Sequence, residues 1–473
     1  MSSQIRKRIS KKVTKALHDF GMIEDGDKVL VAVIAASLSV CASAGEIFVD
    51  AKNGKDGEGR GSEAAPYLTI QAAVDAAKAG DTITLFPGDY TNGVRETTVS
   101  SNTSKNRVVI DRKLTIRSKD GRASRDVTRI VGAWDETEIA STPYGYGPNA
   151  VRCVWLASGS SGTVLEGITF FRGSAPYYGN NGNGTCGGGV HVSANTIGVV
   201  VKDCAFIECQ GTRGGGLYTD QQGQASNYGD HCVYAVRTLF KRCRCSKYGY
   251  AMRGGMAVCC VFDDNDRARN KSGGTVGEGG SCGAFSYGFS AFNCTFVNNF
   301  AYGVGGDGTF NDGVYNCIFL NNSSGAFGST AVGSRYYACV NDANKKENGS
   351  VNNAIYNSLE VCSPCDDDYR LTTRAKSLTS GNSDYLTKIP EAFRDKDYYG
   401  NPRTTDGVLY CGASQTVAES EYSGVAVRWT TSGEWMVDGE KMNCVCRTWK
   451  GYSGYHTFLM KFIPANAATA LLS

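Results

Sequence analysis

Hydrophobic and polar positions between residues 168 and 322 follow a short pattern that returns along the chain. Its centre is a phenylalanine that is followed three residues later by Cys or Asn. In most copies a Cys also stands two residues before the phenylalanine. The phenylalanines are Phe206, Phe240, Phe262, Phe296 and Phe319, which are 34, 22, 34 and 23 residues apart. A recurring period of about 20–50 residues indicates a solenoid, a propeller or an array of repeats.

The local pattern identifies the repeat as a coil of β-strands. Cys-x-Phe is an alternation with a period of two, which places both side chains on one face of a strand. Glycine clusters between the copies would interrupt a helix. A unit of 22 residues has room for three short strands and three bends, which is one coil of a parallel β-helix. Asn265, Asn299 and Asn322 recur at one bend, so we expect an amide ladder there that tolerates left-handed backbone.

Known repeats carry the same pairing of motifs. Segments of the form G-G-x-hydrophobic alternate here with F-x-x-N, and this combination resembles the repeats of polymorphic outer-membrane proteins and related bacterial β-helices. The resemblance covers residues 46–413. It implies an all-β fold, the right-handed parallel β-helix of the pectin-lyase-like superfamily. It also implies a secreted or surface-displayed bacterial protein, and it assigns no chemistry.

Both ends of the expected β-helix have boundaries in the sequence. Residues 46–90 resemble the entry segment of extracellular bacterial β-helices, in which Thr69 would cap a short helix that covers the open apolar end of the solenoid. Residues 400–413 resemble the closing coil of bacterial cell-surface β-helix proteins. Strand-like runs around Asp438-Gly439 predict a small C-terminal β unit. The expected organisation is therefore a leader at 1–44, a β-helix at 45–413 and the β unit at 414–473.

The leader has the features of an export signal. Val29 to Ala44 is an apolar run of signal-peptide length, and it ends in the cleavage pattern Ala42-Ser43-Ala44. We therefore expect a secreted or cell-surface protein with no membrane span in the mature chain. Residues 1–33 also resemble the opening of tRNA 2-thiocytidine-type ATP pyrophosphatases. Residues 34–39 read I-A-A-S-L-S where those enzymes have a phosphate loop, so their activity is not implied.

Charge and cysteine content narrow the function classes. The chain has 49 basic and 46 acidic residues and a net charge of +3. Because this basic excess is small, the sequence does not predict nucleic acid as a partner. The chain has 19 cysteines, and those in register with phenylalanine are expected to be buried thiols. A few disulfides among loop cysteines such as Cys186, Cys232 and Cys282 are the alternative. Cys362 and Cys365 form a lone C-x-x-C, which is a weak zinc signal.

Three insertions lengthen the coils and form the first candidate site. They lie at residues 175–186, 221–232 and 266–281, and insertions in neighbouring coils are expected to gather into one wall that binds ligand. Aromatic rings stack on sugar faces and amides bond to hydroxyl groups, so the contents suit a polysaccharide or another surface glycan. The predicted binding residues are Tyr177, Tyr178, Asn180, Tyr228, Asp230 and His231. Solvated loops without a ligand are the alternative.

A polar ladder on the outside of two coils is the second candidate. Gly189-Val190-His191 and Gly216-Leu217-Tyr218 hold equivalent positions, so His191 and Tyr218 are expected to face outward, stacked about 4.8 Å apart. Arg213 stands just before the second group of glycines. A His or Tyr base beside a cation is able to remove the proton α to a uronate carboxylate, which is the first step of a polysaccharide lyase. An ordinary outward ladder is the alternative.

The third candidate is a cluster of carboxylates. Asp263, Asp264 and Asp266 are close enough in sequence to bind calcium together. They also lie at the F-x-x-N bend, where acidic residues are common, so structural charges are the alternative. No cofactor other than calcium is expected.

Two functions remain from the sequence. The first is a secreted or cell-surface β-helix protein that binds polysaccharide or other surface glycans without chemistry. The second is a polysaccharide lyase or hydrolase that acts on a uronate-containing glycan at the face of the long coils. The sparse set of acid and base residues favours the first.

Overall fold

A computed structural model describes most of the chain between residues 44 and 464. The described residues are 44–99, 102–137, 144–176, 183–219, 233–268, 283–300, 302–305, 313–320, 322–323, 325–327, 336–337, 339–341, 351–352, 368–372, 381–404, 407–415, 417–418, 427–429, 435–437, 440–450 and 456–464. Met1–Ser43 and Ala44–Ser473 form two separate units. The predictions for the export signal and for the nucleotide-enzyme resemblance therefore lie outside the described residues.

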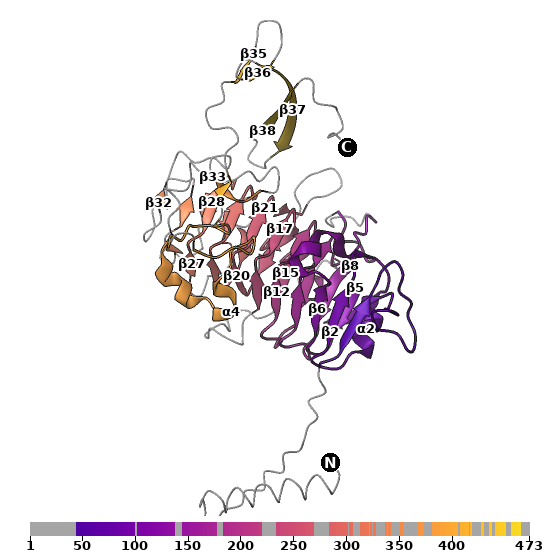
Figure 1. The fold of residues 1–473 in the computed structure, drawn as a ribbon. Helices are drawn as coiled ribbons and strands as arrows, with labels where there is room; N and C mark the ends of the chain where they lie inside the picture. The colour runs from indigo at the N-terminus through magenta and orange to yellow at the C-terminus, as the bar shows by residue number, and fades with distance from the viewer. Residues whose placement is uncertain are drawn as a thin grey trace, which may run out of the picture. The chain divides into compact units, whose positions relative to one another are not determined.

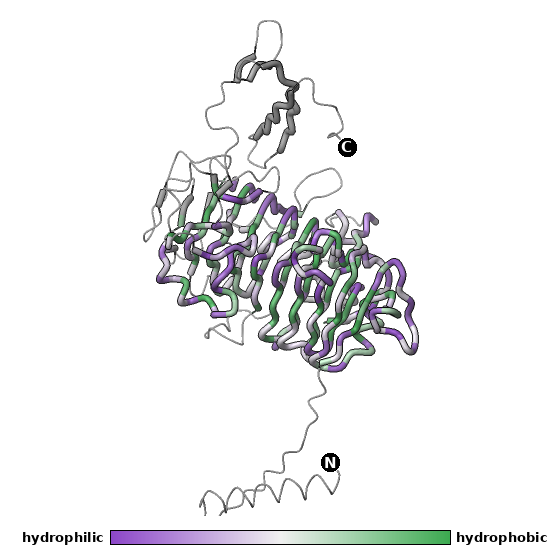
Figure 2. The backbone as a smooth tube through the Cα atoms, in the orientation of Figure 1, coloured by the Kyte–Doolittle hydropathy of each residue, from purple (hydrophilic) through white to green (hydrophobic). Residues whose placement is uncertain are grey.

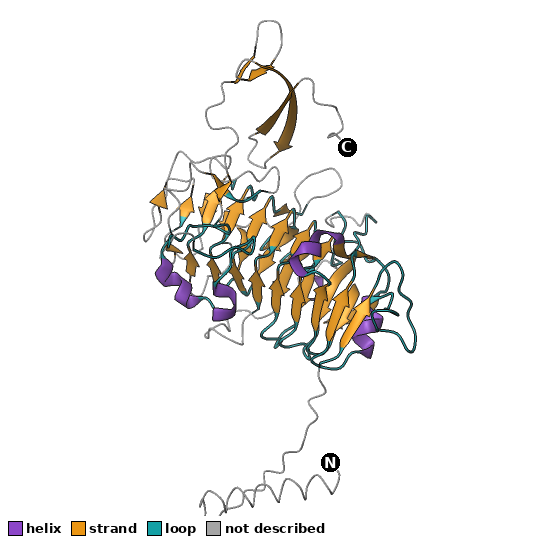
Figure 3. Cartoon of the chain, in the orientation of Figure 1, coloured by secondary structure: helices purple, strands orange, loops and turns teal. Residues whose placement is uncertain are grey.

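Three long sheets form the body of the second unit (Figures 1 and 3). Sheet 1 contains β1 (Glu46–Val49), β2 (Thr82–Leu85), β6 (Thr115–Ser118), β9 (Val164–Glu166), β12 (Val200–Lys202), β16 (Tyr234–Val236), β20 (Met256–Val258), β24 (Ser290–Phe292), β27 (Gly313–Tyr315) and β30 (Tyr336–Tyr337). Sheet 2 contains β3 (Gly88–Tyr90), β7 (Thr128–Val131), β10 (Thr169–Phe171), β13 (Ala205–Ile207), β17 (Leu239–Lys241), β21 (Val261–Asp263), β25 (Thr295–Val297), β28 (Ile318–Leu320), β31 (Val340–Asn341) and β32 (Val351–Asn352). Sheet 3 contains β4 (Arg95–Val99), β5 (Asn102–Ile110), β8 (Val151–Leu156), β11 (Val190–Val192), β15 (Leu217–Thr219), β19 (Met252–Arg253), β23 (Gly283–Ser286), β26 (Tyr302–Val304) and β29 (Gly325–Phe327).

The chain visits the sheets in a fixed order, so the predicted parallel β-helix is confirmed. Each coil passes from sheet 1 to sheet 2 and then to sheet 3, and neighbouring strands of each sheet pair in parallel, except for the antiparallel pair β4 and β5. A short fourth sheet between sheets 2 and 3 contains β14 (Gln210–Arg213), β18 (Arg244–Tyr248) and β22 (Asp266–Arg267). The corner after sheet 1 has left-handed backbone at Gly167, Asp203, Arg237, Cys259, Asn293 and Asn316, and the corner after sheet 2 has it at Arg172, Glu208, Arg242, Asp264 and Asn298.

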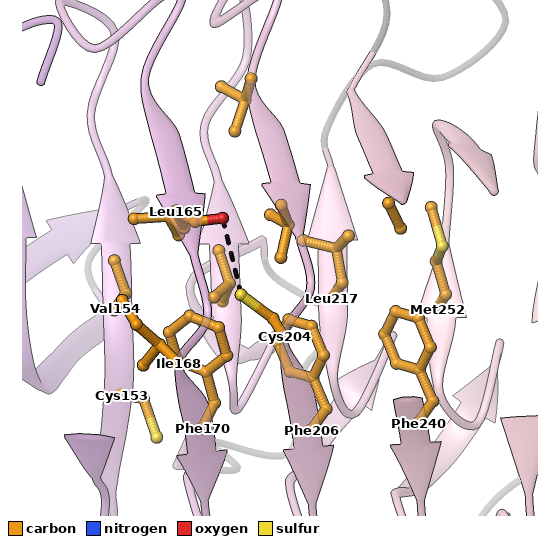
Figure 4. Packing of buried hydrophobic residues seen from close by; sticks show 14 of the residues in the cluster. Cys153, Val154, Leu165, Ile168, Phe170, Cys204, Phe206, Leu217, Phe240 and Met252 are labelled. Atoms are coloured by element: carbon orange, nitrogen blue, oxygen red, sulfur yellow. Dashed lines mark hydrogen bonds between the residues drawn. The ribbon is translucent and has the colours of Figure 1, made fainter. Parts of the chain in front are cut away.

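The core is a column of phenylalanines and thiols inside the coils. Phe206 pairs with Phe240, and successive rings of the column are 4.6–4.8 Å apart between centroids. Cys204, Cys260, Cys294 and Cys317 are fully buried thiols without disulfides, as the Cys-x-Phe alternation predicted. Figure 4 shows Cys204 beside the rings of Phe170 and Phe206, with its thiol directed at the carbonyl of Leu165. Figure 2 shows the hydrophobic positions recurring from coil to coil.

The predicted asparagine ladder is also present. The side-chain oxygen of Asn299 accepts from the amide of Asn265 at 2.8 Å, and its own amide donates to Asn322 at 2.9 Å. All three are buried. The left-handed residue lies one position earlier than expected, at Asp264 and Asn298. The ladder residues therefore fix the bend through hydrogen bonds, while their predecessors carry its strained backbone.

A short helix covers the first coils, as predicted. Helix α2 (Ile70–Ala76) begins at Thr69, whose hydroxyl accepts from the backbone N–H of Ala72. The side-chain amide of Gln71 accepts from the N–H of Val109 and donates to its carbonyl. Val109 lies on β5 beyond the residues that pair with β4. Gln71 thus satisfies backbone groups of an edge strand, which would otherwise be open to another chain.

Residues 368–415 depart from the expectation. The sequence predicted a β-helix that continues to residue 413 and ends in a closing coil, but the described parts of this stretch pack back on the outside of the coils. Tyr369, Tyr398 and Tyr410 form a buried cluster with outward residues of sheet 2 such as Leu239 and Val261. The remaining helices of the described chain are η1 (Gly121–Val127), η2 (Asn183–Thr185), η4 (Ser383–Lys388) and α4 (Glu391–Arg394). We refer to residues 368–415 as the return segment.

The C-terminal residues form separate small sheets. β33 (Leu371–Thr372) pairs with β34 (Val417–Ala418). An antiparallel sheet contains β35 (Val427–Trp429), β36 (Trp435–Val437), β37 (Glu440–Lys450) and β38 (His456–Pro464), which is the β structure expected after residue 413. Among the residues that the structure describes, no helix has the length and apolar character needed to cross a membrane.

Candidate functional site

The predicted outward ladder exists, but it does not face solvent. His191 on β11 pairs with Tyr218 on β15, and their ring centroids are 5.1 Å apart. Trp155 on β8 extends the column and stacks on His191 at 4.0 Å. Both His191 and Tyr218 have an exposed fraction of 0%, and His191 Nδ1 lies 3.2 Å from the carbonyl of Cys186. Alternation along a strand determines the face of a side chain and not what covers that face, so the expectation of an exposed base is wrong.

Arg213 does not lie beside His191 on sheet 3. It is on β14 of the fourth sheet, and its guanidinium is 5.9 Å from the ring centroid of Tyr248. The cation next to Tyr218 is instead Arg253, at 5.6 Å from the ring. The sequence analysis missed Arg253, although its position just before Gly254-Gly255 resembles the position of Arg213 before its glycines.

The three insertions do not leave the β-helix at one corner. Residues 175–186 and 266–281 lie between the strands of sheet 2 or the fourth sheet and those of sheet 3, whereas residues 221–232 lie between β15 of sheet 3 and β16 of sheet 1. Their bases therefore flank sheet 3 on its two sides and do not build one wall. Counting residues between phenylalanines locates the coil of an insertion but not its corner. The predicted binding residues Tyr177, Tyr178, Asn180, Tyr228, Asp230 and His231 lie outside the described residues.

One of the predicted calcium ligands, Asp263, is engaged by other side chains. Asp263 is buried and accepts from the Tyr369 hydroxyl at 2.8 Å, from Lys241 Nζ at 3.2 Å and from the Asn298 amide at 3.2 Å. Within the described ranges no three His, Cys, Asp or Glu residues are placed to hold a metal ion, so Asp263, Asp264 and Asp266 do not form such a group. Burial, together with the neighbouring carboxylates, raises the pKa of Asp264 to about 8.

A cavity on the outside of sheet 2 brings together cationic and aromatic side chains. Its volume is about 370 Å³, and we call it the cationic cavity. It lies between η1, the outward face of β13 and β17, and the return segment. Its lining comprises Arg122, Arg125, Asp126, Ala205, Ile207, Leu239, Lys241, Arg242, Tyr369, Tyr398 and Tyr399. Four cationic side chains therefore line the cavity against one carboxylate.

Tyrosine rings hold one side of the cationic cavity in place. The guanidinium of Arg122 lies 4.4 Å from the ring centroid of Tyr398 and 5.9 Å from that of Tyr399. Arg125 donates to the Tyr398 hydroxyl at 3.3 Å. Cation–π contacts of this kind contribute about 0.5–2 kcal/mol each, depending on their desolvation. These contacts fix η1 against the return segment, and Arg125 is in addition paired with Asp126 at 2.8 Å.

Two of the carboxylates behind the cavity are each shared by two arginines. Asp203 makes two short hydrogen bonds with Arg237, at 2.8 and 2.7 Å, and is 3.6 Å from Arg122. Burial raises the pKa of Asp203, but the hydrogen bonds and charge of Arg237 outweigh it, so the pKa is lowered and the group is ionised.

The second shared carboxylate is Glu208. It lies 3.2 Å from Arg242 and 3.8 Å from Arg172. One negative charge thus serves two guanidinium groups at both places. Arg125 is paired with Asp126 at 2.8 Å and Lys241 with Asp263 at 3.2 Å, so the excess positive charge on the cavity side comes from Arg122 and Arg242.

Sequence reasoning could not assemble this cavity, because its walls are far apart in the chain. Lys241-Arg242 directly follows a core phenylalanine and was a local signal for outward charge. Nothing local connects it with η1 or with Tyr398, which lies more than 150 residues further along the chain. The contact depends on the return segment, whose path no repeat pattern specifies.

Comparisons with known proteins give little beyond the fold. No known protein family matches the sequence, and no curated protein matches it. Among solved structures, the chain is similar to one described as a rhamnogalacturonan lyase, with a TM-score of 0.30 and 11% sequence identity over 71% of this chain and 98% of that one. The assignment as a parallel β-helix rests on the three sheets and their register and not on this similarity.

Proposed function

We propose that this chain is a secreted or cell-surface β-helix protein that binds an acidic polysaccharide or surface glycan in the cationic cavity. One observation carries the proposal, namely the excess of positive charge beside tyrosine rings in a cavity of about 370 Å³. Arginine pairs well with carboxylate and sulfate groups, and the apolar faces of sugar rings stack on tyrosine. The volume is at the lower end of the range of about 300–1,000 Å³ that is usual for small-molecule sites.

The contacts favour binding over chemistry. Lys241 and Tyr369 are the lining groups best suited to proton transfer, and both donate to the carboxylate of Asp263. A lyase needs a base with an open lone pair directed at the substrate. We therefore assign the cavity to recognition of charged sugars and retain lyase activity only as an outcome for experiment.

Calorimetric titration of the folded protein tests this proposal. A trimer of galacturonate and a neutral galactose trimer are compared with wild-type protein, Arg122→Gln, Arg242→Gln and the control Arg129→Gln. Arg129 is also an outward arginine of sheet 2, paired with Asp89, and lies outside the cavity. We expect the acidic trimer alone to bind, and each cavity substitution to weaken binding about tenfold or more, since a hydrogen bond to a charged group is worth about 1.5–3 kcal/mol.

Two results would contradict the proposal. One is binding of the neutral trimer as tight as that of the acidic trimer. The other is equal affinity of the control and the cavity variants. Absorbance of unsaturated products in the same solutions shows whether the acidic trimer is also cleaved.

A further inference from the structure

Arg253 lies on the outward face of sheet 3, on β19, between two tyrosine rings. Its guanidinium is 4.2 Å from the ring centroid of Tyr287 and 5.6 Å from that of Tyr218. Only 3% of the residue is exposed. A guanidinium group carries a positive charge and has five N–H donors. Arg253 therefore places a positive charge in a nearly buried position.

The hydrogen-bonding groups of this arginine are not satisfied. Neither Nε nor Nη1 of Arg253 has a hydrogen-bond partner, and Arg253 forms no ion pair with a carboxylate of the described residues. Burying an ion without a partner destabilises the folded state, and two cation–π contacts offset only part of that cost.

A second arginine of the same sheet shows what a satisfied site looks like. Arg152 on β8 is fully buried, and it also lies beside a ring, 5.0 Å from Trp155. It donates to Ser104, to the side chain of Asn106 and to the carbonyls of Gly184, Cys186 and Gly187. An arginine buried on this face is thus able to form hydrogen bonds with all of its nitrogen atoms. Arg253 differs because its Nε and Nη1 have no hydrogen-bond partner.

The surroundings of Arg253 add a further cation. Tyr287 contacts Tyr248 with ring centroids 6.3 Å apart, and the guanidinium of Arg213 lies 5.9 Å from Tyr248. The Nε of Arg213 is also buried without a hydrogen-bond partner. Two guanidinium groups, each with at least one buried N–H that has no hydrogen-bond partner, thus lie against the two rings of one tyrosine pair. A negative charge is the partner that such a group needs.

We propose that Arg253 is the centre of an anion-binding site on sheet 3, and that this site takes a small oxyanion such as a carboxylate or a sulfate. The oxyanion accepts from the unsatisfied N–H groups of Arg253 and lies against the tyrosine rings. It is either a free ion or the charged group of an acidic sugar, since both present the same oxygens. This site is separate from the cationic cavity and does not depend on it.

Linkage between anion binding and stability tests the proposal. An anion that binds only the folded chain raises its stability by RT ln(1 + [L]/Kd). Unfolding is followed with acetate, sulfate, galacturonate and uncharged galactose for wild-type protein, Arg253→Met and Arg129→Met. We expect the Tm of the wild type and of Arg129→Met to rise by about 2 °C per tenfold increase of anion above the dissociation constant. Arg253→Met should show a smaller rise than the wild type, because only the cationic cavity is left to bind anions. Without anion it should be at least as stable as the wild type, because the substitution removes an uncompensated buried charge.

The arms of the experiment also separate the two sources of the anion. An effect of galacturonate at much lower concentration than acetate identifies a sugar subsite, and equal effects identify a free-ion site. The same anion dependence in Arg253→Met as in the wild type would overturn the proposal. If Arg253→Met does not fold, crystals of the wild type soaked in sodium bromide decide, since the proposal requires an anomalous peak beside Nε or Nη1 of Arg253. The part of the rise that Arg253→Met removes should remain in Arg122→Gln, whose own effect reports only on the cationic cavity, so either proposal can fail alone.

Discussion

At the scale of single residues, the inward positions were predictable and the outward ones were not. The Cys-x-Phe alternation placed Cys204 and Cys294 in the core because a strand has only two faces. The same reasoning placed His191 and Tyr218 correctly in register, but it could not show that both are buried. What covers an outward side chain depends on segments distant in sequence. Arg253 was missed for that reason.

The buried thiols lead to a first prediction. Cys317 is fully buried, and its sulfur lies 3.3 Å from the backbone N–H of Cys294. Cys317→Ser should lower the free energy of unfolding by about 1–3 kcal/mol, because a hydroxyl is costlier to bury than a thiol. Urea denaturation measures the change, and Cys317→Ala controls for lost volume.

Cys204 should resist alkylation at pH 8 in the folded protein, because burial raises the pKa of its thiol to about 12. Rapid alkylation, or a disulfide at Cys204 or Cys317, would show that the core assignment is wrong.

Asp264 gives a prediction for pH. Burial and the charges of Asp263 and Asp266 raise its pKa to about 8, above the usual value of about 3.9. The folded chain therefore holds a proton that the unfolded chain has released, so this group makes stability fall as the pH rises from about 4 to 8. Asp264→Asn should gain stability relative to the wild type between pH 5 and pH 9, as measured by urea denaturation.

The control for this pH dependence is a carboxylate with the opposite shift. A hydrogen bond from Arg112 lowers the pKa of Asp111, which is thus ionised throughout that range. The difference in the free energy of unfolding between Asp111→Asn and the wild type should therefore stay constant between pH 5 and pH 9. If the free energy of unfolding depends on pH in the same way in Asp264→Asn and in the wild type, the pKa of Asp264 is not raised.

At the scale of elements, the repeat predicted the strands and the asparagine ladder, while the capping helix was predicted from residues 46–90, with Thr69 as its N-cap. The strands and the ladder depend on local alternation or on residues that recur at one bend. The corners from which the insertions leave depend on where extra residues enter a coil, and the spacing between phenylalanines does not contain this information. The return segment has no repeat pattern at all, and its packing on sheet 2 became visible only in the structure.

The ladder can be tested at its middle member. Asn299 bonds to both Asn265 and Asn322 and also donates to the carbonyl of Phe262 at 2.9 Å. Asn299→Ala leaves several buried groups unpaired, and we expect a loss of about 2–4 kcal/mol in the free energy of unfolding. The exposed Asn149, which accepts from Lys105, serves as the control, and its replacement by Ala should change stability by less than about 0.5 kcal/mol. Equal losses in the free energy of unfolding for the two substitutions would show that the ladder makes no specific contribution to stability.

At the scale of the whole molecule, stacking of coils explains why the sequence predicted the fold but not the candidate site. Every coil buries its inward face against its neighbours, so one repeated pattern determines the architecture. The cationic cavity instead joins η1, the middle coils and the return segment. Such a site is a property of the tertiary path and is not encoded in the repeat.

Export is a further expectation at this scale. The apolar run that ends in Ala42-Ser43-Ala44 predicts cleavage after Ala44. Intact-mass measurement of protein exported by a bacterial host should therefore give a chain that begins at Gly45. Exported protein that still carries residues 1–44 would refute the assignment of this segment as a signal.

The most direct test of the central claim is the position of a bound acidic sugar. A crystal structure of the protein with a galacturonate trimer should show a carboxylate within hydrogen-bond distance of Arg122, Lys241 or Arg242, and a sugar ring near Tyr398 or Tyr399. Density for the trimer at the insertions, or a cationic cavity that stays empty at saturating trimer, would contradict the account.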